Sequence, residues 1–77
     1  RIDAMTPQQK QLRTCYERYG FAEVEPAEGG GFAIRIIQTH RGKTPVYGYV
    51  SYASGSAFKW ESEQEAVTFL AETLTDL

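Results

Sequence analysis

Two helix-start signatures, one near each end of the chain, constrain its fold more than any other feature. Thr6 followed three residues later by Gln9 has the form of a capping box, and Pro7 falls at the first helical position, where its missing N–H costs nothing. Ser62 and Glu65 repeat the capping pattern near the other end. We therefore predict a helix at each end, and the rest of this 77-residue chain has to fold against those two helices.

Both predicted helices have an apolar side. In the first helix, apolar residues recur at the spacing of one helix face until Gly20, which supplies a left-handed stop. These residues are Leu12, Cys15, Tyr16 and Tyr19. The last helix has a wider stripe, formed by Ala66, Val67, Phe69, Leu70, Ala71, Thr73 and Leu74. Each stripe needs an apolar partner surface, and we expect that surface to be one face of a sheet.

The middle of the chain predicts antiparallel strands. Residues 32–39 and 46–53 are rich in β-branched and aromatic side chains, and a turn containing Arg41-Gly42 separates them, which favours a hairpin. Residues 21–25 alternate apolar and acidic side chains and form a candidate additional strand that Pro26 closes. The sheet is therefore expected to have three strands, or four if residues 21–25 join it.

A second tight turn sets the expected register of the last strand. If Gly55 takes the left-handed position of a three-residue turn, Val50 lies opposite Phe58 and Gly48 opposite Trp60. This register puts both aromatic side chains on the face that the helices cover and lays the indole over the bare backbone of Gly48.

These elements predict an α+β fold with an N-terminal helix, a three- to four-stranded antiparallel β-meander and a C-terminal helix, both helices packed on one face of the sheet. We predict one small domain over residues 5–77, with Met5 as the native start and residues 1–4 as a cloning remnant. The alternative, that the chain is a domain excised from a longer protein, stays open.

Few residues are suited to catalysis or metal binding. The chain has one cysteine, Cys15, and one histidine, His40, which excludes an internal disulfide and a zinc site built from such ligands within one chain. Cys15 falls on the apolar side of the first helix, where we expect a buried, inert thiol. Gly42-Lys43-Thr44 matches the end of a P-loop, but the earlier glycine and the following helix are missing. We predict a protein that is not an enzyme and that has no metal and no cofactor.

The same composition gives an expectation for location. No apolar run approaches the roughly 18 to 20 residues that cross a bilayer, and no charged-then-apolar leader stands at the start. Secreted domains of this size usually depend on disulfides, which one cysteine cannot supply. We therefore expect a cytoplasmic protein without a membrane partner.

Charge is unevenly distributed although the formal net charge is only −2. Residues 32–60 contain four basic residues and no acidic one, whereas residues 61–77 contain five acidic residues and no basic one. The predicted strands are therefore basic and the last helix is acidic.

The face of the sheet turned away from the helices, the outer face, is the candidate contact surface. It should display Ala33, Arg35, Ile37, Tyr47, Tyr49, Ser51, Ala57 and Lys59. Tyrosine and arginine are enriched in binding hot spots. We predict that Arg35, Ile37, Tyr47, Tyr49 and Lys59 bind a protein partner or a second copy of the chain, with the aromatic and aliphatic side chains as anchors. The protein would then be an adaptor, regulator or inhibitor.

Two alternatives remain for the same surface. In the first, nucleic-acid bases stack on the tyrosines and phosphates lie near Arg35, His40, Arg41, Lys43 and Lys59. In the second, the side chains only stabilise a solvated sheet through cross-strand packing and cation–π contact. We rank protein binding above nucleic-acid binding because the chain is acidic overall and non-specific nucleic-acid affinity comes largely from phosphate neutralisation.

The predicted order of helix, three strands and helix is similar to that of double-stranded RNA-binding domains. Those domains present lysines at the start of the last helix, whereas this chain has Glu61, Glu63 and Glu65 there. The segment from Phe58 to Ala66 resembles the strand-to-helix step of small DNA-binding integrase arm domains. Both resemblances concern element order and a short segment, so they carry an expectation of fold rather than of function.

Overall fold

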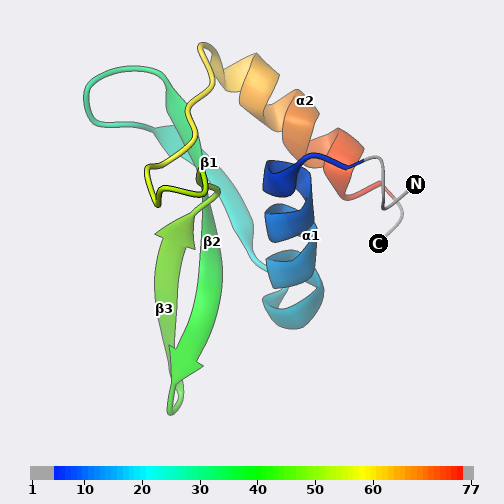
Figure 1. The fold of residues 1–77 in the computed structure, drawn as a ribbon, viewed down its shortest axis with the longest axis vertical. Helices are drawn as coiled ribbons and strands as arrows, with labels where there is room; N and C mark the ends of the chain where they lie inside the picture. Colours follow the sequence, from blue (N-terminus) through cyan, green and yellow to red (C-terminus); the bar gives the residue numbers. More distant parts are fainter. Residues whose placement is uncertain (1–4, 76–77) are drawn as a thin grey trace.

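The computed structural model describes residues 5–75, in which two helices pack against a three-stranded antiparallel sheet (Figure 1). The elements are α1 (Pro7–Tyr19), β1 (Ala22–Pro26), β2 (Phe32–Arg41), β3 (Thr44–Tyr49) and α2 (Glu63–Thr73). The predicted α+β fold is confirmed. Residues 1–4, predicted to be a cloning remnant, lie outside the described residues.

Helix α1 begins and ends where the local signals predict. The Thr6 hydroxyl accepts a hydrogen bond from the Gln9 amide at 3.2 Å, and the Gln9 side-chain oxygen accepts one from the Thr6 amide at 3.0 Å. At the other end, Gly20 has a φ of 68° and donates its amide to the Tyr16 carbonyl at 2.8 Å. Two backbone donors at the start and one carbonyl at the end are thereby paired, which holds α1 to its 13 residues.

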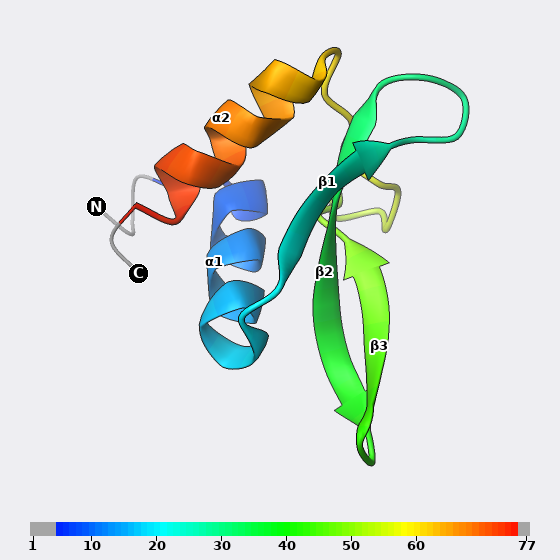
Figure 2. The same ribbon diagram turned by 180° about the vertical axis from the view of Figure 1, so that it is seen from behind.

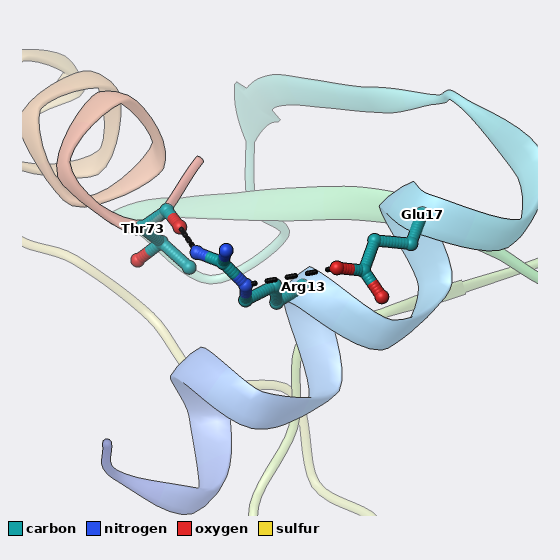
Figure 3. Close-up of polar contacts among 3 residues, drawn as sticks. All are labelled: Arg13, Glu17 and Thr73. Carbon is teal, nitrogen blue, oxygen red and sulfur yellow. Dashed lines mark hydrogen bonds and ion pairs between the residues drawn. The ribbon is translucent and has the colours of Figure 1, made fainter. Parts of the chain in front are cut away.

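Helix α2 begins at the predicted cap, because the Ser62 hydroxyl accepts a hydrogen bond from the Glu65 amide at 3.1 Å. Its last turn has no basic residue of its own. Arg13 of α1 fills that role by donating from Nη1 to the Thr73 carbonyl at 3.0 Å, while its Nε lies 3.8 Å from the Glu17 carboxylate (Figure 3). A cation at a helix C-terminus is favourable, so this contact ties the two helices together.

The apolar stripe of α2 is narrower than its sequence predicts. Ala66 and Thr73 are buried, whereas Val67 is 46% exposed and Ala71 is also exposed. The sheet covers only one side of this helix, so apolar residues beside the buried row remain in solvent.

In the sheet, β2 is the central strand between β1 and β3. Residues 21–25, the candidate additional strand, supply most of β1, which pairs with β2 through Ala22 opposite Ile36 and Val24 opposite Ile34. The register between β2 and β3 shifts after Ile37. The third strand of the sheet is thus β1, on the opposite side of β2 from β3.

The strand expected after the Gly55 turn does not form within the described residues. Near the turn the predicted register holds, since Ser51 bridges Ala57 and the Phe58 amide donates to the Val50 carbonyl at 2.8 Å. Beyond this point the chain leaves β3. The structure therefore has three strands, and the segment over residues 51–60 contributes only isolated bridges.

The predicted pairing of Trp60 with Gly48 is wrong. Trp60 pairs with Phe32 at the start of β2 through two backbone hydrogen bonds of 2.8 Å. This position brings the indole to 4.9 Å from the Phe69 ring of α2, which a place opposite Gly48 would not favour. The space beside Gly48 is filled by the Gln38 side chain instead, because a Cβ added to Gly48 would clash with Gln38 Cδ.

The hydrophobic core lies between the sheet and the two helices, which both cover the same face (Figure 2). Its buried residues are Leu12, Ile34, Ile36, Val50, Trp60 and Ala66. Gln11 of α1 also reaches the end of β3, where its side-chain oxygen accepts the Ser51 amide at 2.8 Å. Neither helix in residues 5–75 has the length and apolar character needed to cross a membrane.

Candidate functional site

The outer face is built from rows of side chains that the strand register places side by side. One row runs Glu23, Arg35, Tyr49 across the three strands, and the next pairs Ile37 with Tyr47. Because side chains alternate along a strand, these residues point away from Ile34 and Ile36, which lie in the core.

The two tyrosines of β3 are large, exposed side chains that give the outer face apolar area. Tyr47 is 44% exposed and Tyr49 is 38% exposed. Ile37, predicted as a third anchor, is only 8% exposed and offers little area for contact. Its cross-strand partner Tyr47 lies edge-on to the Phe21 ring, with 5.4 Å between ring centres, so aromatic side chains rather than a helix surround this part of β2.

Arg35 occupies the middle of the outer face and is already engaged. Its guanidinium carbon lies 4.1 Å from the centre of the Tyr47 ring, and its Nη1 lies 3.6 Å from a Glu25 carboxylate oxygen. Its side chain keeps about a third of its exposure. The positive charge is thus shared between an aromatic ring and a carboxylate within the sheet.

Glu25 also binds Tyr49. The Tyr49 hydroxyl donates a hydrogen bond of 2.6 Å to the second carboxylate oxygen of Glu25. This hydrogen bond, supported by slight desolvation and by the negative charge of Glu25 itself, raises the pKa of the Tyr49 hydroxyl above its ordinary value, while Arg35 opposes the shift. Tyr49 therefore remains a neutral hydrogen-bonding side chain at physiological pH.

A hollow with a volume of about 660 Å³ opens at one end of the outer face. The β1–β2 loop contributes Ala27 and Glu28 to it, and the segment after β3 contributes Ala57 and Lys59. Tyr49 lines it from the sheet. The Lys59 ammonium donates to the Glu28 carbonyl at 3.1 Å and so bridges the two loops.

The basic residues of the nucleic-acid alternative are not gathered in one place. Arg41 and Lys43 are exposed at the β2–β3 turn, and the six residue-to-residue steps of strand from Arg35 to Arg41 span about 20 Å. His40 is exposed and meets the Tyr19 ring of α1 with 4.8 Å between ring centres. Lys59 lies at the hollow, so the five residues are distributed along the length of the sheet.

Acidic residues of the outer face are the feature that the charge count over residues 32–60 overlooked. Glu23 and Glu25 lie on β1 beside Arg35 and Ala33, and Glu28 lines the hollow. The alternation of apolar and acidic residues over 21–25 was the signal that could have located them. The outer face therefore carries both signs of charge and is not basic.

Other candidate chemistry has little support in the geometry. Cys15 is half-buried, and burial raises the pKa of its thiol despite the opposing charge of Arg18, which disfavours the reactive thiolate. Across residues 5–75, no three side chains of histidine, cysteine, aspartate or glutamate cluster as metal ligands.

No protein-family model, no curated protein and no solved structure matches this chain. The function therefore has to be inferred from the site.

Proposed function

We propose that this protein is a non-enzymatic interaction module that binds another protein through the outer face. The observation that carries the proposal is the pair of exposed tyrosines on β3, 44% and 38% exposed, beside an arginine on the central strand. Tyrosine and arginine dominate the energy of many interfaces because they combine apolar area with directional hydrogen bonds. An adaptor, regulator or inhibitor of cytoplasmic location fits a domain whose main surface feature is a contact patch.

The charges of the outer face favour a protein partner over a nucleic acid. Glu23 and Glu25 share the face with Arg35, whose charge is already balanced by Glu25 at 3.6 Å. A phosphate backbone approaching the tyrosines would meet these carboxylates, and binding by counterion release needs several unpaired cations. A protein surface can complement both signs of charge at once.

A nucleic-acid role is the second candidate, and one observation favours it. Residues 38–44 at the end of the β2–β3 hairpin are exposed and include His40, Arg41 and Lys43 without an acidic residue, and this end projects beyond α1 (Figure 1). Such a tip would contact phosphates rather than stack bases, because the exposed tyrosines of β3 lie farther along the strand. This candidate predicts salt-sensitive binding centred on the tip.

Site-specific photo-crosslinking tests the proposed function. A photoreactive phenylalanine analogue replaces Tyr47, and in a matched control it replaces Val67, which is 46% exposed on α2. We expect a discrete protein adduct from position 47 and none from position 67. Equal adducts from both positions, or none from position 47, would contradict binding through the outer face.

A substitution at Tyr49 then measures how much the outer face contributes to the affinity for the partner. Tyr49→Ala should weaken association with the cross-linked partner by about 2 kcal/mol, or about 30-fold, as truncation of a hot-spot tyrosine does. Thermal stability should change little because the side chain is 38% exposed. Loss of folding with unchanged affinity would show that Tyr49 serves the fold alone.

Amide-shift NMR separates the kinds of partner. Shifts at Tyr47 and Tyr49 that change with protein concentration would identify the partner as a second copy of the chain. Shifts at Arg41 and Lys43 that appear with duplex or single-stranded nucleic acid and weaken with salt would support the second candidate instead.

A further inference from the structure

The outer face already contains one complete arrangement that holds a cation. The Arg35 guanidinium lies 4.1 Å from the centre of the Tyr47 ring and 3.6 Å from the Glu25 carboxylate. An aromatic ring on β3 and a carboxylate on β1 thus hold a positive charge between them, with Arg35 of β2 supplying it. Ring and carboxylate each stabilise the cation, by cation–π attraction and by ion pairing.

The same elements recur two residues farther along β3, at Tyr49, where the cation is missing. Tyr49 donates to Glu25 at 2.6 Å and lines the hollow together with Glu28. Across residues 5–75, the only cation placed over an aromatic ring is Arg35 over Tyr47. Tyr49 therefore has carboxylates beside it, and no cation from the described part of the chain lies on its ring.

One carboxylate at the hollow has no ion-pair partner among residues 5–75. Glu25, Glu28 and the Lys59 ammonium line the hollow, but Glu25 is already paired with Arg35 at 3.6 Å. That ammonium is directed to the Glu28 carbonyl, 3.1 Å away in the β1–β2 loop. Within residues 5–75, the Glu28 carboxylate forms no ion pair. An added positive charge would therefore find an acceptor that residues 5–75 leave without an ion pair.

Small apolar side chains complete the hollow. Ala27, Ala33 and Ala57 line it beside the Tyr49 ring, so a ligand with an aliphatic stem can lie against methyl groups while its charged end reaches the Glu28 carboxylate. Lysine and arginine side chains have this construction. A free metal ion or a small polar anion would leave the apolar lining without a contact.

We propose that the hollow accepts a lysine or arginine side chain of the protein partner, with the cation at the Tyr49 ring and the Glu28 carboxylate. This inference rests on the proposed function, because it names the chemistry by which the outer face recognises a partner. The partner would carry an exposed basic side chain beside an apolar patch that covers Tyr47.

Capped tripeptides test the inference without the partner. Acetyl-Ala-Arg-Ala-amide is titrated into the labelled protein and followed by amide-shift NMR, with norleucine or glutamate at the centre as comparisons. We expect shifts at Ala33, Ala57 and Glu28 with the arginine peptide, affinity about fivefold weaker with norleucine, which keeps the stem but lacks the charge, and no shift at these positions with glutamate.

A pair of charge-neutralising variants provides the control. Glu28→Gln should weaken the binding of the arginine peptide about threefold. Glu72→Gln removes the same charge from an exposed position on α2 and should leave the affinity for this peptide unchanged. Equal weakening by both variants would show only a general effect of net charge and would overturn the site. The site would also be overturned if the arginine and norleucine peptides bound equally well, or if the glutamate peptide bound more tightly than the arginine peptide.

A failure of this inference can be distinguished from a failure of the proposed function. If none of the peptides shifts the hollow while Tyr49→Ala still weakens the cross-linked complex, the outer face binds its partner without a cation and this inference is wrong. If the arginine peptide binds as expected while position 47 gives no adduct, the hollow holds a basic side chain and the proposed use of the tyrosines fails.

Discussion

The two faces of strand β2 are both buried, but by different means. On the inner face, Ile34 and Ile36 have no exposed surface and pack in the core with residues of both helices. On the outer face, Ala33 is 2% exposed and Ile37 is 8% exposed, yet neither helix covers this side (Figure 2). Here individual side chains, rather than a helix, surround the buried residues.

This difference between the two faces indicates which residues serve folding and which serve binding. Inner-face residues are covered by whole helices, so removing their side chains leaves cavities that rigid elements cannot fill. On the outer face, Tyr47 lies opposite Ile37, and Phe21 and Arg35 lie against the Tyr47 ring. These side chains can rearrange when a neighbour is removed. We therefore expect substitutions on the inner face to act on folding, and those on the outer face to act mainly on association.

Trp60→Ala should have the largest effect on folding. Trp60 is 9% exposed and lies 4.6 Å from the Phe58 ring and 4.9 Å from the Phe69 ring, measured between ring centres. We expect the free energy of unfolding to fall by about 4 kcal/mol, measured by urea denaturation. Tyr52→Ala, at a residue that is 50% exposed, should cost less than about 1 kcal/mol. Similar losses for both would show that Trp60 is not part of the core.

Two adjacent isoleucines compare the faces directly. Ile36→Ala should lower the free energy of unfolding by about 3 kcal/mol and Ile37→Ala by about 1.5 kcal/mol, because only the first cavity is enclosed by helices. The residue type and the strand are the same in both variants, so the difference reports the face alone. Equal losses would mean that side chains close the outer face as firmly as helices close the inner one.

The sequence predicts those parts of this structure that depend on local signals. The helix caps at Thr6, Gly20 and Ser62 lie where the capping patterns place them, since each involves hydrogen bonds within a few residues. The pairing of Ile37 with Tyr47 could also be predicted, because alternation along the two strands leaves few registers that bury one face.

Features that depend on distant segments could not be predicted in this way. Gly48 and Phe32 were both available backbone partners for Trp60, and the choice follows from the position of Phe69 on α2. The charge of the candidate site also depends on a distant segment, since Glu25 of β1 becomes the neighbour of Arg35 only when the sheet forms. A charge count along the chain cannot detect such neighbours.

The buried hydroxyl of Thr73 predicts a smaller change in the free energy of unfolding, and this change is an increase. Thr73 is 2% exposed, and its hydroxyl oxygen has no hydrogen-bond partner among residues 5–75, although its carbonyl binds Arg13 (Figure 3). Thr73→Val keeps the shape and removes the unpaired hydroxyl, so it should raise the free energy of unfolding by about 1 kcal/mol. Thr68→Val, at an exposed position of the same helix, should change it by less than about 0.5 kcal/mol. A loss of stability in Thr73→Val would indicate that the hydroxyl is hydrogen-bonded in solution.

The last prediction concerns the pH dependence of the outer face. The hydrogen bond to Glu25 raises the pKa of Tyr49 in the folded protein above its ordinary value of about 10. As pH rises, the unfolded chain therefore loses this proton first, and the contribution of Tyr49 to folding declines from about pH 10 upward. NMR titration of labelled tyrosine rings measures the pKa of each ring separately.

Glu25→Gln should lower the pKa of Tyr49 toward its ordinary value, because the charged acceptor of the hydrogen bond is gone. Glu23→Gln removes the same charge from β1 but not the hydrogen bond, so it should move the pKa less. Equal changes in the two variants would mean that the hydrogen bond contributes nothing beyond charge. In that case the Tyr49 hydroxyl would be free to bond a partner, and the outer face would be less pre-organised than its contacts with Glu25 and Arg35 indicate.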